Sequence, residues 1–235
     1  MGAIGGFLTG VYAMESLDPE LLRQAISQLG SKETVLALTA LQSLGYAVIC
    51  GVFGVILSEK IGLWRRITFE KDKLSAPLAI SLIGGLALSV GDYYIFGSFI
   101  ERVKNSYEVK PSITYILASF TYGGVVEEVM LRLFVMSLIA FIITRVFYKN
   151  EKVAPVAALV TANIISALLF AAGHIPATIQ TFGGLSPVIL IRCFVMNGAF
   201  GLAFGWLYRK YGIQYAMLAH FGCHFISKRI WLLVF

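Results

Sequence analysis

Three apolar segments of this chain carry ionisable side chains that can act together. These are Glu127, Glu128 and Arg132 in the first segment, His174 in the second, and His220 and His224 in the third. Ionisable groups at membrane depth cost about 2.5–3.5 kcal/mol each on insertion scales, so they are rarely present there without a function. We therefore predict that the three segments share one polar site inside a membrane.

The two adjacent acids have different prospects on a helix. Glu128 and Arg132 are four residues apart, with the acid first, and can pair along one face. Glu127 is rotated from Glu128 by about 100° and need not join that pair. One carboxylate can thus be held by the arginine while the other faces a cavity and acts as a general base on water. The residues alone leave an alternative open, in which this is a structural ion pair with a spare acid.

The histidines are weak signals individually and stronger together. Phe170 and His174 are four residues apart on one helix face, and a lone histidine at a helix end is usually a capping or snorkelling residue. His220 and His224 also share a face, at a spacing that can bind a metal or bracket a substrate carbonyl. Combined with Glu127 they predict a chemical site built from three helices.

The composition fixes the class of protein. Of 235 residues, 58% are hydrophobic and 14% are charged, well below the 25% or so that is typical of soluble domains. We predict a multi-pass integral membrane protein, of the cell membrane if the source is prokaryotic, surrounded by membrane lipids. The basic residues lie almost wholly in short connections rather than on one face, so no nucleic-acid partner is expected.

The hydropathy pattern predicts an all-α bundle of about six to seven transmembrane helices. Strong spanning candidates lie at 34–57, 76–98, 113–147, 154–172, 187–208 and 213–235. The third is longer than one crossing requires, so it is expected to tilt, to break near Gly123-Gly124 or to run past the bilayer. We divide the chain into an N-terminal piece, 1–33, and a transmembrane helical domain, 34–235.

The N-terminal piece is expected to contain a helix on the membrane surface. Residues 3–13 are apolar but too short for an ordinary span. Asp18-Pro19-Glu20 is a favourable helix start, and Gly30 can end that helix. An apolar face opposite polar residues predicts an amphipathic interfacial helix.

The positive-inside rule gives a predicted orientation. Connections 58–75, 146–153 and 209–212 carry about ten Lys and Arg, against three at 101–111 and none at 173–186. The basic set is therefore expected in the cytoplasm and the 173–186 connection outside. Asp92 and Arg192, which lie within predicted spans, are expected to pair as a brace between helices. Lys228 and Arg229 are expected to bring the last helix to the lipid headgroups.

The order of these motifs resembles one known family. Glu-Glu-x-x-x-Arg at 127–132, Phe-x-x-x-His at 170–174 and a distal helix with a histidine pair at 220–224 are similar to the CPBP family. That family comprises type II CAAX prenyl endopeptidases and the bacteriocin-processing or immunity proteins also called Abi. The Gly-rich approach at 201–212 fits as well, and the resemblance covers about 112–226.

The resemblance implies a helical intramembrane protease that cleaves a hydrophobic or lipidated peptide, such as a prenylated CAAX tail or a bacteriocin leader. It implies that Glu127 activates water, that His174 assists, and that His220 and the residue at 224 stabilise the oxyanion. Glu128, Arg132 and Phe170 would have structural and positioning roles. The family's metalloprotease label leaves the cofactor open between zinc and none. If zinc binds, its ligands would be Glu127, His174, His220 and His224.

Two residues depart from the family pattern. Position 224 is His where Asn or Asp is usual, and Leu133 stands where Gly is common. An imidazole can donate one hydrogen bond in place of an amide, can favour a metal, or can mark a member that has lost activity. The alternatives to a protease are therefore a non-catalytic CPBP-fold scaffold or immunity protein, and a proton or cation pathway. The pathway predicts inverted repeats, which the sequence lacks.

Overall fold

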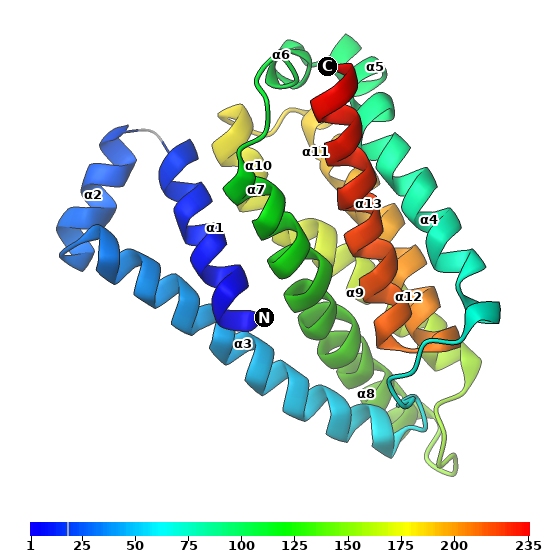
Figure 1. The fold of residues 1–235 in the computed structure, drawn as a ribbon. Helices are drawn as coiled ribbons and strands as arrows, with labels where there is room; N and C mark the ends of the chain where they lie inside the picture. The colour runs from blue at the N-terminus through cyan, green and yellow to red at the C-terminus, as the bar shows by residue number, and fades with distance from the viewer. Residues whose placement is uncertain (18) are drawn as a thin grey trace.

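The computed structural model describes residues 1–17 and 19–235, and all regular structure within them is helical (Figure 1). The all-α prediction is confirmed. In chain order the helical segments are α1 (Gly2–Ser16), α2 (Pro19–Leu29), α3 (Lys32–Lys60), η1 (Lys71–Lys73), α4 (Ser75–Leu86), η2 (Ala87–Gly91), α5 (Asp92–Tyr94), η3 (Phe96–Ser98), α6 (Glu101–Ser106), α7 (Ile113–Ala118), η4 (Ser119–Glu127), η5 (Val129–Met136), α8 (Ser137–Phe147), α9 (Val156–Gly173), α10 (Ile175–Phe182), α11 (Pro187–Phe194), η6 (Val195–Ala199), α12 (Phe200–Tyr211) and α13 (Ile213–Val234).

Within the described residues, five helical stretches are long and apolar enough to cross a membrane. They are Lys32–Lys60, Lys71–Ser98, Ile113–Phe147, Val156–Phe182 and Pro187–Tyr211. Each coincides with a predicted span, so the protein is a multi-pass integral membrane protein. α13 runs back alongside α12 through the same bundle (Figure 1). The full number of crossings, six to seven, stays a prediction.

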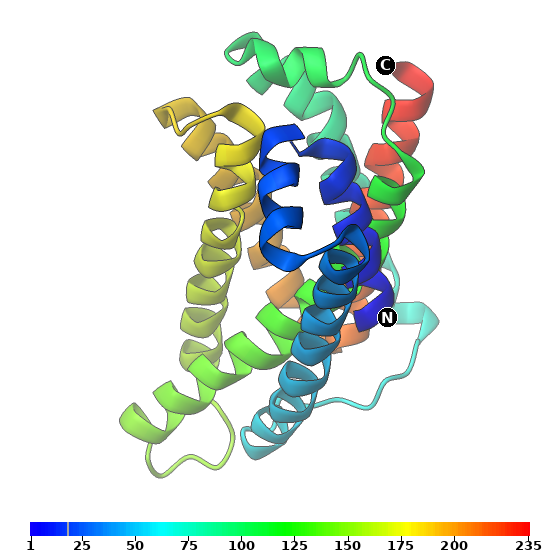
Figure 2. The ribbon, with the colours of Figure 1, turned by 90° about the vertical axis from the view of Figure 1, so that its left-hand side faces the viewer.

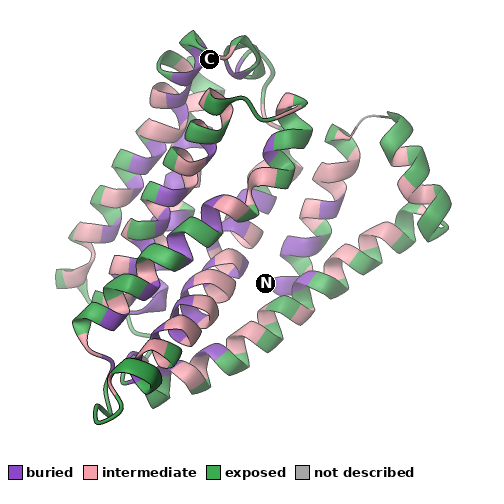
Figure 3. Ribbon diagram, turned by 180° about the vertical axis from the view of Figure 1, so that it is seen from behind, coloured by how far each residue is buried: buried purple, intermediate pink, exposed green. Residues whose placement is uncertain are grey.

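The outer surface of the bundle is apolar, as a lipid-facing surface must be. Large hydrophobic side chains such as Leu41, Ile83 and Leu233 are more than half exposed. Buried residues line the inner faces of the helices and exposed ones the outer faces (Figure 3). Soluble proteins rarely expose apolar surface on this scale, whereas the bilayer covers it.

The N-terminal piece forms two short helices. The 15-residue α1 packs against α3 and against α7 and η4. A methyl group on Gly6 would lie only 2.4 Å from Ser43 Cβ, so this glycine is required for the contact. α2 begins at Pro19 with Glu20 in its first turn and ends before Gly30, whose φ is +96°. Asp18, the expected cap, lies outside the described residues, and the membrane-surface position of α2 stays a prediction.

The long third span is one continuous helix with a widened centre. Instead of breaking at Gly123-Gly124 it becomes π-helical through η4 and η5, and it crosses the bundle diagonally (Figure 2). A methyl group on Gly124 would lie 3.2 Å from the Phe221 backbone of α13. The glycine thus lets the two helices approach closely. π-Helical turns occur frequently at functional sites.

α13 occupies the middle of the bundle. It packs against α4, α12 and η4, and its residues Tyr215, Ala219 and Cys223 are fully buried in the core. This packing brings the histidines of α13 to the helix that carries the paired acids.

The connections that are rich in Lys and Arg gather at one end of the bundle. The segments 61–74 and 148–155 and the connection between α12 and α13 lie together at the lower end in Figure 1, and 183–186 lies at the upper end. This common location agrees with the predicted grouping, and the assignment of the basic end to the cytoplasm stays a prediction.

We expect Gly184→Cys to react with a membrane-impermeant maleimide added outside intact cells, and Asn150→Cys to react only after permeabilisation. A side chain at Gly184 meets open space, and Asn150 is exposed. The unmodified chain is the background control, because its Cys193 and Cys223 are buried and Cys50 is half-buried. Labelling of Asn150→Cys from outside would show that the orientation is the reverse of the predicted one.

Candidate active site

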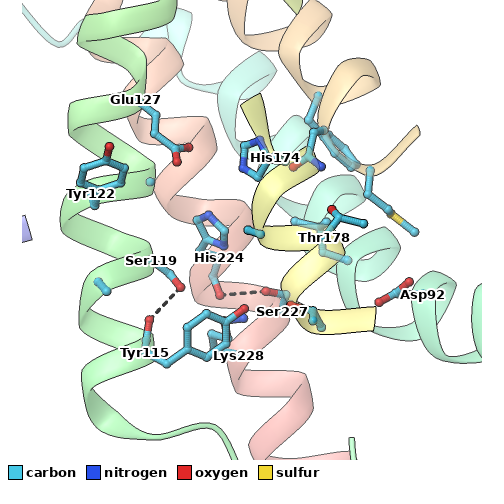
Figure 4. A pocket seen from close by; sticks show the side chains of 18 of the residues that line it. Asp92, Tyr115, Ser119, Tyr122, Glu127, His174, Thr178, His224, Ser227 and Lys228 are labelled. Atoms are coloured by element: carbon cyan, nitrogen blue, oxygen red, sulfur yellow. Dashed lines mark hydrogen bonds between the residues drawn. The ribbon is translucent and has the colours of Figure 1, made fainter. Parts of the chain in front are cut away.

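A cavity of about 490 Å³ lies within the bundle and is lined by residues from helices along the whole chain, from α1 to α13. All four predicted catalytic residues line it, namely Glu127, His174, His220 and His224, and so does Phe170. In Figure 4 the Glu127, His174 and His224 side chains point into the same space, from η4, the end of α9 and α13. The predicted meeting of three segments is therefore present.

Glu127 and His224 meet over a glycine one turn before the acid. A methyl group built on Gly123 would lie 3.0 Å from His224 Nε2 and 3.9 Å from Glu127 Oε2. The carboxylate and the imidazole are thus gathered around one point, and the absence of a side chain at Gly123 leaves room for both. Both groups line the cavity, so a water molecule or a substrate carbonyl that occupies it can approach both.

The orientation of His174 is fixed by the backbone. His174 directly follows α9, and its Nδ1 lies 2.8 Å from the carbonyl oxygen of Phe170. Because a carbonyl only accepts hydrogen bonds, Nδ1 carries a proton, and Nε2 of the neutral ring is an acceptor. The ring of Phe170 also contacts the His174 ring edge to face at 4.8 Å. These two contacts leave Nε2 available to a group in the cavity.

Glu128 lies behind the cavity and holds two side chains. It is fully buried, its Oε1 accepts a hydrogen bond from His220 Nδ1 at 2.8 Å, and Arg132 Nη1 lies 3.4 Å from the same oxygen. The predicted pairing of Glu128 with Arg132 is confirmed, whereas its bond to His220 was not predicted. His220 is 92 residues farther along the chain, so no local spacing indicates this contact.

Aromatic rings enclose the buried arginine. Arg132 Cζ lies 4.3 Å from the centre of the Phe170 ring and 5.5 Å from that of Phe204. The Phe204 ring also stacks on His220, with centroids 4.6 Å apart. The guanidinium nitrogens make no hydrogen bond to any described residue. Arg132 is therefore held by the charge of Glu128 and by ring faces, which attract cations in a desolvated site.

A second charged group lies toward the other end of the cavity. Arg192 donates to both oxygens of Asp92, at 2.7 and 2.6 Å, and the Tyr107 hydroxyl donates to Asp92 Oδ2 at 3.2 Å. The predicted brace between these charges is confirmed. Burial, and next the charge of Asp92, raise the pKa of Tyr107, so its hydroxyl stays protonated and can donate.

Several cavity residues were not identified from the sequence. Lys228 is only 6% exposed and lines the cavity, which corrects the expectation that it reaches the headgroups. Its neighbour Arg229 is exposed, as expected. Tyr115, Ser119 and Tyr122 of the acid-bearing helix also line the cavity. Tyr115 and Ser119 are four residues apart, and Ser119 and Tyr122 are three apart, which is ordinary helix periodicity. Only the packing of the helices therefore distinguishes these cavity residues from residues on any other helix face.

The cavity residues do not form a metal site in this arrangement. Among the described residues, no group of three or more His, Cys, Asp or Glu side chains is arranged to hold a metal ion. The Nδ1 atoms of His174 and His220 bond to the Phe170 carbonyl and to Glu128, so the Nε2 atoms are the ones that face a ligand. The zinc ligand set considered from the sequence stays a prediction, and the roles derived below use side chains alone.

Substitutions of the two adjacent acids are expected to differ in their effect on the stability of the fold. Glu128→Gln leaves the buried Arg132 without its carboxylate, which is expected to cost about 3–5 kcal/mol and to lower the thermal unfolding temperature in detergent. Glu127→Gln removes a charge that faces the cavity and has no ion-pair partner among the described residues, so that temperature should not fall. Equal losses in the two variants would contradict this division.

The comparisons with known proteins agree with the motifs. A family model described as type II CAAX prenyl endopeptidase Rce1-like matches residues 109–226, about half of the chain and the part that contains Glu127, His174, His220 and His224. No curated protein and no solved structure matches the chain. The chain therefore belongs to the Rce1-like family of type II CAAX prenyl endopeptidases.

Proposed function

We propose that this protein is an intramembrane endopeptidase that hydrolyses a membrane-associated peptide with water activated by Glu127. The observation that carries the proposal is the convergence of Glu127, His174, His220 and His224 on one cavity within the family-matched segment. General acid–base hydrolysis needs a carboxylate with access to water and donors aimed at the oxyanion, and these residue types supply both.

In the proposed reaction, Glu127 takes a proton from a water molecule while the water oxygen attacks the scissile carbonyl carbon. Nε2 of His174, which is an acceptor in the neutral ring, orients that water. The peptide C–N bond then breaks, and Glu127 returns the proton to the departing nitrogen. The products are a new carboxyl terminus on the membrane-bound part and a released peptide with a free amine.

His220 and His224 are proposed to stabilise the oxyanion of the tetrahedral intermediate. The His220 Nδ1 bond to Glu128 fixes that ring, and when the ring is doubly protonated its Nε2–H can donate toward the cavity. The His224 ring stacks on His220 with centroids 4.9 Å apart, and its Nε2 lies beside Gly123 and Glu127. An imidazole N–H there can replace the amide donor that is usual in the family.

The second departure from the family pattern does not touch the cavity. Leu133 is buried in the core, and a methyl group on Gly54 of α3 would lie 2.8 Å from it. We propose that this leucine fills a contact between helices. The site's burial among membrane helices limits water access and restricts cleavage to hydrophobic or lipidated peptides that can enter the bilayer. A prenylated CAAX tail is the substrate that the family description favours.

Cleavage of farnesylated CAAX peptides by the detergent-purified protein should fall about 10²- to 10⁴-fold in Glu127→Gln, because the general base is lost. Unchanged thermal unfolding is the folding control for this variant. A chelator should leave the wild-type rate unchanged, because in this mechanism Glu127 activates the water without a metal ion. Equal cleavage by wild type and Glu127→Gln would refute the mechanism, and a protein that cleaves nothing would favour a non-catalytic scaffold or immunity protein.

Gly123→Ala should lower the cleavage rate severalfold without unfolding the protein, because the rate is sensitive to small misplacements of a positioned group. The added methyl group would lie 3.0 Å from His224 Nε2, so the ring would have to shift by a few tenths of an ångström. Gly45→Ala on α3 is the matched control, since a methyl group there meets nothing within 4 Å. A normal rate for Gly123→Ala would contradict the proposed gathering of groups over this glycine.

A further inference from the structure

The buried ammonium group of Lys228 lines the cavity, and the proposed mechanism does not use it. Lys228 is 6% exposed, and its Nζ lies 3.9 Å from the centre of the Tyr115 ring and 5.0 Å from that of Trp231. No carboxylate among the described residues lies within ion-pair distance of it. Lysine is almost never buried to this extent unless it is paired.

The neighbouring charges do not supply the missing anion. Arg192 already occupies both oxygens of Asp92, so that carboxylate is neutralised by its own partner. Tyr115 offers its ring face and its hydroxyl to Lys228, and Trp231 offers its ring face, but neither is a carboxylate. Lys228 therefore leaves one uncompensated positive charge at this end of the cavity, and a bound anion would balance it.

Lys228 also lies at a definite distance from the candidate site. It follows His224 by four residues on α13, one turn away, and Figure 4 shows the two side chains on the same side of the helix with Tyr115 beside Lys228. That turn spans about 6 Å at 1.5 Å per residue. An extended peptide covers about 3.3 Å per residue, so a group two or three residues beyond the scissile carbonyl reaches the ammonium.

We propose that Lys228 binds the free C-terminal carboxylate of the substrate and so selects peptides that end shortly after the cleavage site. This inference rests on the proposed peptidase function and adds the end of the chain as a recognition element. The carboxylate and the ammonium form a charge-assisted hydrogen bond, which is strengthened where the ammonium is as buried as that of Lys228. Lys228 is thus assigned as a specificity-determining residue.

The test compares two farnesylated peptides of one sequence, Cys(farnesyl)-Val-Ile-Ser, with a free C-terminal carboxylate or a C-terminal amide. Wild type should cleave the carboxylate form with a kcat/KM at least about tenfold higher, the factor expected from one charge-assisted bond. Lys228→Met should lower cleavage of the carboxylate peptide to the level of the amide and leave the amide unchanged. Lys228→Arg should keep part of the preference.

Arg229→Met is the matched control, because it removes a neighbouring cation that is exposed and does not line the cavity. It should behave as wild type. Equal cleavage of the two peptides by wild type would overturn the inference. An equal loss of cleavage for both peptides in Lys228→Met would also overturn it, because such a loss would indicate a structural role. Thermal unfolding of Lys228→Met tests that structural role directly.

Binding of the same labelled peptides to Glu127→Gln, followed by fluorescence anisotropy in neutral detergent, separates this inference from the peptidase proposal. Carboxylate recognition predicts that Glu127→Gln binds the carboxylate peptide more tightly than the amide peptide. The double variant Glu127→Gln/Lys228→Met should bind the two peptides equally. This result would support carboxylate recognition even if wild type cleaves nothing. Cleavage without any difference between the peptides overturns carboxylate recognition and leaves the peptidase proposal intact.

Discussion

Arg132 is fully buried among apolar helices, and Glu128 supplies the negative charge beside it. The same carboxylate oxygen accepts a hydrogen bond from His220, so one buried acid joins the long diagonal helix to α13. A guanidinium in such surroundings is costly unless a charge opposes it, which makes this cluster a strong constraint on how the two helices meet. The orientation of the histidines of α13 follows from it.

Adjacent acids therefore have opposite surroundings. Glu128 is enclosed by its partners and by the rings of Phe170 and Phe204 near Arg132, while Glu127 reaches the cavity. Glu127 is the last residue of η4, and Glu128 lies between η4 and η5. A widened turn changes which direction each side chain faces, and this is one reason why such turns recur at functional sites. The helix can thus supply both a fixed structural charge and a reactive one.

Charge is distributed along the cavity rather than concentrated at one point. Glu127, His174 and His224 lie at one end, while Asp92 and Lys228 lie toward the C-terminal end of α13 (Figure 4). Arg192 pairs with Asp92 at that end. In the proposed function, a short peptide would lie along the cavity with its scissile carbonyl near Glu127 and its terminal carboxylate near Lys228.

The sequence by itself determined the membrane class, five of the spans, the pairing of Glu128 with Arg132 and the residues whose types suit hydrolysis. These properties follow from hydropathy and from i, i+4 geometry, which are local along the chain. It did not indicate that His220 bonds to Glu128, that Phe204 stacks on His220, or that Lys228 turns inward. Those contacts join residues on different helices, and only the packing of whole helices decides which side chains meet across them.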